Sequence, residues 1–97
     1  MVSNIQIIWG NRAKNDLKDI HLFYAAKSNK AAGKMIDSII KAAESIMFAE
    51  QYQVDEFLGN PYRRLIVKHC KIVYRLKNNT IVIFRVFDTR QNPSKLK

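Results

Sequence analysis

The sequence is poor in residues that build covalent or metal-bound scaffolds: it has one cysteine and two histidines among 97 residues. A single cysteine excludes an internal disulfide, and the His, Cys and carboxylate spacing matches no metal site. Long apolar runs are missing too. None approaches the roughly 18 residues that span a bilayer, and the first residues lack the pattern of a secretion signal. We therefore expect a cytoplasmic protein without a metal or other cofactor.

Acidic residues are scarce in only one part of the chain. Residues 1–61 hold seven Lys/Arg and seven Asp/Glu, whereas residues 62–97 hold ten Lys/Arg and a single acid, Asp88. The whole formal net charge of +9 therefore belongs to the second part. Such a concentration of positive charge indicates a polyanion or an acidic protein surface as partner.

The length and a hydrophobic content of 47% predict one domain, residues 1–97, with a single core. Residues 5–9 predict a first strand. Two helical patterns follow, from about 12 to 27 and from about 30 to 48, in which apolar residues recur at spacings of three and four. Asn11 and Ser28 suit their N-caps. Because the break between the helices is short, we expect an antiparallel hairpin.

The second half of the chain changes to an alternating, β-branched and aromatic pattern. After a joining loop, residues 62–67, 70–77 and 80–87 predict a three-stranded meander. The expected fold class is α+β, with the helix hairpin packed on one face of a mainly antiparallel sheet. Asn78-Asn79 suits a type I′ turn, which sets Tyr74 opposite Ile83 and Val73 opposite Phe84.

This register sorts the meander into two faces. The face expected to receive the helices is apolar and carries Ile72, Tyr74, Leu76, Ile81 and Ile83. The other face combines an apolar strip with cations and carries Lys71, Val73, Arg75, Val82, Phe84 and Val86. We expect it to stay uncovered and to bind a partner, because the tail after residue 88 is too short and polar to cover it.

Several local sequences occur in a distinctive order. The first half contains Ile8-Trp9, Ala13, Asp16-Leu17, Ile20 and Phe23-Tyr24, and the second half contains Tyr62-Arg63-Arg64, the segments 71–75 and 83–87, and Arg90-Gln91-Asn92-Pro93. In this order they resemble the RelE/ParE superfamily of type II toxin-antitoxin toxins over nearly the whole chain. The resemblance implies a growth-inhibiting toxin in a hetero-oligomer with its antitoxin. We predict that the antitoxin contacts the apolar strip at Val73, Val82, Phe84 and Val86.

Toxins of this superfamily act in two ways. RelE-like members cleave mRNA in the ribosomal A site, where basic side chains hold the phosphate while the 2′-hydroxyl attacks. ParE-like members are not nucleases and poison DNA gyrase by binding it. A third alternative is a generic basic nucleic-acid-binding domain, but no recognition helix, RNP motif or zinc signature supports it.

The nuclease mechanism requires cations for the phosphorane and an acid and a base. Arg63, Lys71 and Arg90 match, within a residue, positions where RelE-like toxins carry functional basic residues. His69 is the nearest substitute for an acid or base, because histidine is the side-chain type suited to proton transfer near neutral pH. The C-terminal His or Tyr of many nuclease members is missing, which weakens the case for a nuclease, and the sequence leaves the two mechanisms near parity. Under either mechanism we predict that the target is bound by the other basic residues of the meander: Arg64, Lys68, Arg75, Lys77 and Arg85.

Overall fold

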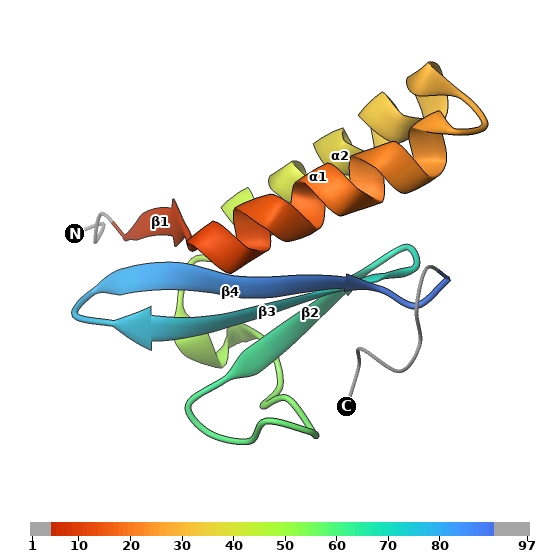
Figure 1. Cartoon of the computed structure of the whole chain (residues 1–97). Coiled ribbons are helices and arrows are strands. Elements are labelled where there is room, and N and C mark those ends of the chain that lie inside the picture. The colour runs from red at the N-terminus through yellow and green to blue at the C-terminus, as the bar shows by residue number, and fades with distance from the viewer. Residues whose placement is uncertain (1–4, 91–97) are drawn as a thin grey trace.

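A computed structural model describes residues 5–90, and these form two helices packed on one face of a four-stranded sheet (Figure 1). The elements in chain order are β1 (Gln6–Trp9), α1 (Asn11–Ala25), α2 (Asn29–Glu44), the short 3-10 helix η1 (Ala49–Gln51), β2 (Arg63–Val67), β3 (Cys70–Lys77) and β4 (Thr80–Asp88). This arrangement confirms the predicted α+β class and the helix hairpin. Neither helix is long and apolar enough to cross a membrane.

The strands lie in the order β1-β4-β3-β2, and all neighbours are antiparallel except β1 and β4. β1 therefore occupies one edge of the sheet and β2 the other. The parallel pair follows from the connection, because the chain leaves β1 for the helix hairpin and returns only as the meander. At the end of β1, a Cβ on Gly10 would meet the carbonyl oxygen of Ile83 at 3.1 Å, so glycine permits this close turn into α1.

The helix ends differ slightly from the predicted ones. Gly10, not Asn11, is the N-cap of α1, and it offers no side-chain acceptor. Ser28 caps α2 as predicted, since its hydroxyl accepts a hydrogen bond from the N–H of Ala31 at 3.1 Å. α2 ends at Glu44, short of the predicted end near residue 48, and Met47 beyond it is 69% exposed.

The core lies between the hairpin and the sheet and contains buried residues from α1, α2, β2, β3 and β4, with Ile7 and Trp9 of β1 packed against it. Ile20, Ile39, Ile72 and Tyr74 are at most 1% exposed. The Tyr74 hydroxyl donates to the carbonyl of Ala49 at 2.9 Å, which ties the chain after α2 to the centre of β3. Burial of the ring raises the pKa of Tyr74 to about 12.

The meander turns as predicted but does not keep the predicted register. Asn78 and Asn79 have φ values of 50° and 63°, as a type I′ turn requires, and Tyr74 lies opposite Ile83. Beyond that pair a bulge places Val73 opposite Arg85, so the predicted pairing of Val73 with Phe84 is wrong. One extra residue moves every later side chain of β4 to the other face.

The bulge changes the composition of the face that lies away from the helices, called the outer face below. Val86 pairs with Ile72 and joins the core at 2% exposure, so its predicted place on the outer face is wrong. Phe87, opposite Lys71, takes an outer position instead. The bulge is a long-range feature that the alternation of apolar residues in β4 did not reveal.

The outer face is also partly covered, which corrects the prediction that no element is available to cover it. The segment from Ala49 to Tyr62 starts beside the helices, passes the edge of β2 and lies over the sheet (Figure 1). Lys71 and Val73, predicted as parts of an open surface, are 4% and 0% exposed. The covering segment carries its own apolar side chains, including Phe57 and Leu58.

Candidate functional site

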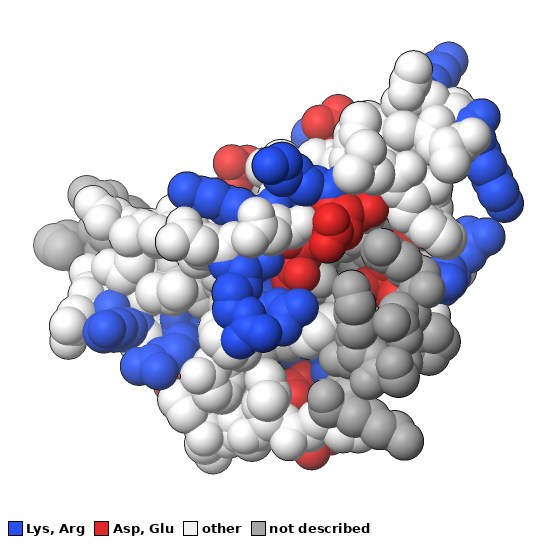
Figure 2. All heavy atoms as spheres, in the orientation of Figure 1, with Lys and Arg blue, Asp and Glu red and all other residues white. Residues whose placement is uncertain are grey.

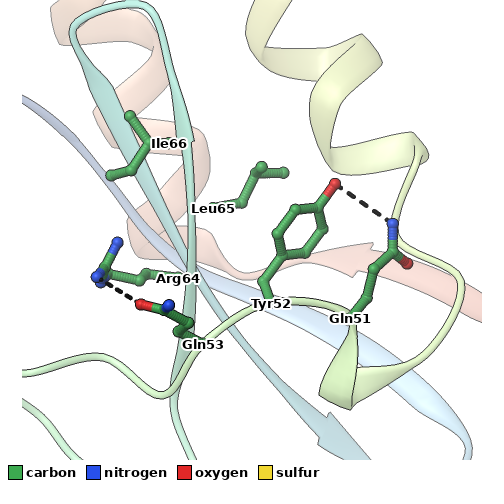
Figure 3. A pocket seen from close by; sticks show the side chains of 6 residues that line it. All are labelled: Gln51, Tyr52, Gln53, Arg64, Leu65 and Ile66. Atoms are coloured by element: carbon green, nitrogen blue, oxygen red, sulfur yellow. Dashed lines mark hydrogen bonds between the residues drawn. The ribbon is translucent and has the colours of Figure 1, made fainter.

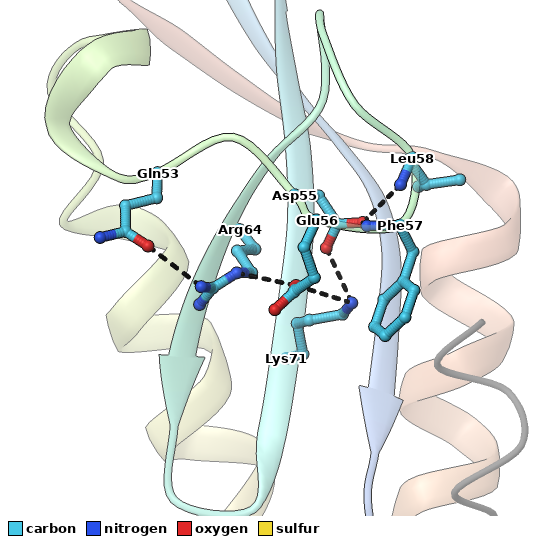
Figure 4. Close-up of polar contacts among 7 residues, drawn as sticks. All are labelled: Gln53, Asp55, Glu56, Phe57, Leu58, Arg64 and Lys71. Carbon is cyan, nitrogen blue, oxygen red and sulfur yellow. Dashed lines mark hydrogen bonds and ion pairs between the residues drawn. The ribbon is translucent and has the colours of Figure 1, made fainter.

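Lys71 lies at the centre of a cluster on the outer face (Figure 4). Its Nζ is 2.7 Å from Asp55 Oδ1 and 3.9 Å from Glu56 Oε1, and the aromatic rings of Phe57 and Phe87 lie 4.9 and 5.7 Å from it. The side chains of Lys71 and Asp55 are only 6% and 0% exposed. This cation is therefore neutralised and shielded within the protein rather than presented to a phosphate.

Asp55 is held by three donors at once. Besides Lys71, the backbone N–H groups of Phe57 and Leu58 donate to its Oδ2 at 3.1 and 2.8 Å (Figure 4). Burial opposes ionisation of this carboxyl, but the hydrogen bonds from Lys71 and the two N–H groups outweigh it and lower the pKa of Asp55. The folded protein therefore favours the charged form.

This shift predicts a pH dependence of stability. Because the pKa of Asp55 is lower in the folded protein, its stabilisation is present above the ordinary pKa of 3.8 and is lost as the pH falls through the folded value. We expect the stability difference between wild type and Asp55→Asn to shrink on going from neutral pH to about pH 3. Urea unfolding of both proteins at a series of pH values measures this stability difference. A difference that stays constant over that range contradicts the assignment.

Arg85 is also paired, with Asp16 of α1. Its Nε and one terminal nitrogen donate to the two carboxylate oxygens at 2.8 and 3.0 Å, a bidentate geometry. The same carboxylate accepts the backbone N–H of Val86 at 2.8 Å. β1 pairs with β4 only as far as Ile83, so Asp16 satisfies an amide that β1 leaves unpaired. We assign a structural role to Arg85.

The four residues predicted for catalysis do not converge. Arg63 donates to the carbonyl of Tyr52 at 2.8 Å and pairs with the core residue Tyr74, whereas Lys71 is buried on the outer face. His69 is exposed in the turn between β2 and β3, and its carbonyl accepts the N–H of Thr89 at 2.9 Å. Arg90 is exposed just after β4.

The basic residues predicted for target binding also fall into different environments. Arg64 lies 3.0 Å from both Gln53 and Glu56 (Figure 4). Lys68 and Lys77 are exposed at the ends of strands, and Lys68 has a positive φ of 54°. Only Arg75 lies within the outer face without an acidic partner in the salt bridges of residues 5–90.

Arg75 ends a row in which two arginines flank two stacked aromatic rings, called here the arginine-aromatic row: Arg12, Phe84, Tyr62 and Arg75. The Arg12 guanidinium lies 6.0 Å from the Phe84 ring centre, the rings of Phe84 and Tyr62 are 4.9 Å apart, and Arg75 lies 5.9 Å from Tyr62. These are distances at which cations and rings attract each other. Arg12 is exposed and the other three are half-buried, so the row forms part of the surface.

Arg75 has one donor without a partner. Its Nε is buried and has no hydrogen-bond partner in the described part of the chain. A buried N–H of a charged group without a partner is costly. Val82, opposite Arg75, adds an apolar surface beside the row. The row is therefore suited to an acidic side chain flanked by apolar or aromatic ones.

Two members of the row were missed in the sequence. Arg12 belongs to the half of the chain that carries no net charge, and Tyr62 stands at the junction between loop and strand. Phe84 and Val82, predicted for antitoxin contact, do lie half-buried on the outer face, whereas Val73 and Val86 are buried. Figure 2 shows the Lys and Arg side chains in several groups on the visible side, with acidic side chains beside some of them.

The chemistry of the outer face follows from these contacts. Its most buried cation, Lys71, is neutralised, and Arg12 and Arg75 lie against aromatic rings. No group of three or more potential metal-ligating side chains occurs within residues 5–90. The arrangement is suited to recognition by stacking, charge and apolar contact, and the contacts described for residues 5–90 place no paired acid and base beside a free cation of this face.

Comparison with known proteins places this geometry in a family. The sequence matches the family model described as ParE toxin of type II toxin-antitoxin system, parDE, over residues 7–93. No curated protein sequence matches the chain.

Two similar solved structures share the fold. A chain of the chromosomal ParDE toxin-antitoxin system from P. aeruginosa superposes with a TM-score of 0.76 at 20% identity, covering 87% of this chain and 95% of that one. A chain of the RelBE2 toxin-antitoxin complex from Mycobacterium tuberculosis gives a TM-score of 0.65 at 15% identity, covering 91% and 93%. With the family model covering nearly the whole length, the chain belongs to the ParE family of toxins from type II toxin-antitoxin systems.

Proposed function

We propose that this toxin inhibits growth by binding DNA gyrase and not by cleaving RNA. The observation that carries the proposal is the state of the basic residues on which a nuclease mechanism would depend. Lys71 is bound to Asp55, and Arg63 lies on the other face of the sheet. A nuclease requires free cations at the phosphate together with an acid and a base, whereas a gyrase poison requires only a binding surface.

The arginine-aromatic row is the proposed contact for gyrase. Arginine and aromatic side chains contribute strongly to protein interfaces, because they bury a large area and add directional hydrogen bonds. Arg75 is held against Tyr62 before any partner arrives, which lowers the entropy lost on binding. In the resting complex, the antitoxin is proposed to cover Val82 and Phe84 of the same surface.

The test measures inhibition of gyrase supercoiling by the purified toxin. We expect inhibition by wild type and at least a tenfold loss of potency for Arg12→Ala with Arg75→Ala, about 1.4 kcal/mol of binding free energy. The matched control is Lys34→Ala with Lys41→Ala, which removes the same charge from exposed positions of α2. Thermal unfolding of each variant checks that the fold is kept.

Induced expression in bacteria distinguishes the two mechanisms. We expect filamentous cells with DNA damage and intact mRNA. Rapid arrest of translation with mRNA cut at codon boundaries would refute the gyrase proposal and would indicate that the ribosome is the target. Equal potency of the row variant and its control would show that the surface lies elsewhere.

A further inference from the structure

The tip of the helix hairpin forms a hollow beside the end of β4. In Figure 1 the turn between α1 and α2 extends beyond that end of the strand. The hollow has a volume of about 500 Å³, within the usual range of small-ligand sites. Its lining comes from the end of α1, the start of α2 and the chain after β4: Phe23, Tyr24, Ala26, Lys27, Ala31 and Arg90. None of these residues belongs to the arginine-aromatic row.

Most of this lining is apolar. Phe23 is 40% exposed, and its ring meets the ring of Tyr24 edge to face, with 5.2 Å between the ring centres. Ala26 and Ala31 are exposed, and their small side chains leave the space beside the rings unfilled. An apolar body that enters this space would exchange contacts with water for contacts with rings and methyl groups, which the hydrophobic effect favours.

Two cations stand at the open side of the hollow. Lys27 and Arg90 are both exposed, and neither takes part in the ion pairs found within residues 5–90. The nearest acid in the chain is Asp88, and its Oδ1 accepts the backbone N–H of Arg90 at 2.8 Å. Charged donors of this kind form strong hydrogen bonds with carboxylates, so together they attract an anionic head group.

Negative charge lies further inside, next to the Tyr24 hydroxyl. This hydroxyl and Asp88 Oδ2 are buried, and neither has a hydrogen-bond partner within the described residues. Burial of the hydroxyl, together with the nearby Asp88 carboxylate, raises the pKa of Tyr24 to about 12. Since Asp88 repels an anion, the head group of a bound anion is expected at the open side and its apolar part inside.

A second hollow, beside β2, has a different character. Its volume is about 420 Å³, and its lining consists of Gln51, Tyr52, Gln53, Arg64, Leu65 and Ile66 (Figure 3). The Gln51 amide lies 3.3 Å from the Tyr52 hydroxyl. Arg64 donates to Gln53 at 3.0 Å and is neutralised by Glu56, also at 3.0 Å. The polar groups that line this hollow are therefore bound to one another and to the covering segment, unlike the cations at the hairpin tip.

We propose that the hollow at the hairpin tip binds a small amphipathic carboxylate, whose apolar or aromatic body lies against Phe23 and Tyr24 and whose head group lies against Lys27 and Arg90. The volume of the hollow suits one such molecule, and the two cations select its charge. The proposal is independent of the target of the toxin, because the arginine-aromatic row takes no part in it.

The test uses three probes with the same phenyl ring and alkyl chain but different head groups: 4-phenylbutyrate, 4-phenylbutanol and 4-phenylbutylamine. Titration of the full chain, followed by NMR of the backbone amides, gives both the affinity and the site. We expect the carboxylate to bind at least tenfold more tightly than the amine, with the alcohol between them. The largest shifts are expected at Ala26, Lys27 and Ala31.

Two variants separate the apolar and the charged contributions. Ala31→Leu fills the hollow with a good helix former and should weaken carboxylate binding at least tenfold, whereas Ala31→Ser keeps the space and should bind as wild type does. Lys27→Gln with Arg90→Gln should weaken binding of the carboxylate at least fivefold and leave binding of the alcohol unchanged. The matched control is Lys34→Gln with Lys41→Gln, which removes the same charge from exposed positions of α2.

Each alternative outcome overturns the proposal. Equal affinities of the three probes would leave only apolar contact, which a protein side chain also provides, and tighter binding of the amine would reverse the selected charge. Largest shifts near the exposed Phe57 or Met47 would place the site elsewhere. A dimer that the carboxylate dissociates in sedimentation would make a second copy the occupant. If Ala31→Leu does not fold, the three probes with wild type still decide, since no saturation at about 10 mM refutes the site.

Discussion

Replacing Asp16 with alanine is expected to lower the free energy of unfolding by about 3 kcal/mol. The substitution leaves the Arg85 guanidinium without its bidentate partner and the Val86 N–H without its acceptor. The ion pair is mostly buried, because the side chains of Arg85 and Asp16 are only 18% and 9% exposed. Urea unfolding at neutral pH, followed by circular dichroism, measures the change.

Two further variants separate the contributions of charge and hydrogen bond. Asp16→Asn keeps an oxygen that accepts from Val86 but removes the negative charge, so we expect roughly half of the alanine effect. Asp19→Ala removes an exposed acid from the same helix and should change stability by less than about 0.5 kcal/mol. If Asp16→Ala is no more destabilising than Asp19→Ala, the carboxylate does not hold α1 to β4.

Lys71→Met is expected to cost about 3 kcal/mol of stability, because it leaves the buried carboxylate of Asp55 without its counter-charge. Combining it with Asp55→Asn should restore stability to within about 1 kcal/mol of wild type, since the amide oxygen still accepts from Phe57 and Leu58 and no unpaired charge remains. Urea unfolding of both single variants and the double variant completes a mutant cycle.

The control is Lys77→Met, which removes an exposed cation from the same strand and should leave stability nearly unchanged. If the double variant loses as much stability as the two single variants together, the ion pair does not couple the strand to the covering segment.

The result also bears on function. Because Lys71 holds this segment in place, loss of toxicity in a Lys71 variant is not evidence of catalysis unless the fold is shown to be intact.

Local patterns in the sequence were sufficient to predict the secondary structure and the arrangement of layers. The spacing of Met35, Ile39 and Ala43 predicted the second helix, and all three are buried in the core. The pair Asn78-Asn79 predicted a type I′ turn that the structure contains. These predictions succeeded because helix periodicity, strand alternation and turn preferences depend on residues only a few positions apart.

The composition of the outer face depended on contacts that local patterns do not contain. The bulge at Phe84 exchanges Val86 for Phe87 on that face, and its only sign is the pairing of β3 with β4. The cover over Lys71 comes from a segment interpreted as a simple connection, although its Phe57 and Leu58 are unusual for a solvated loop.

The fold class, the boundaries of most elements to within a few residues and the location of the positive charge along the chain could all be predicted from the sequence. Which cations are free depends on the packing of the folded chain. Lys71 pairs with an acid 16 residues away and Arg85 with an acid 69 residues away, both from the half of the chain that has no net charge. A charge count along the sequence shows where the cations are. Whether a cation is neutralised depends on its distance in space from an acid, and the packing of α1 and of the covering segment against the sheet determines that distance.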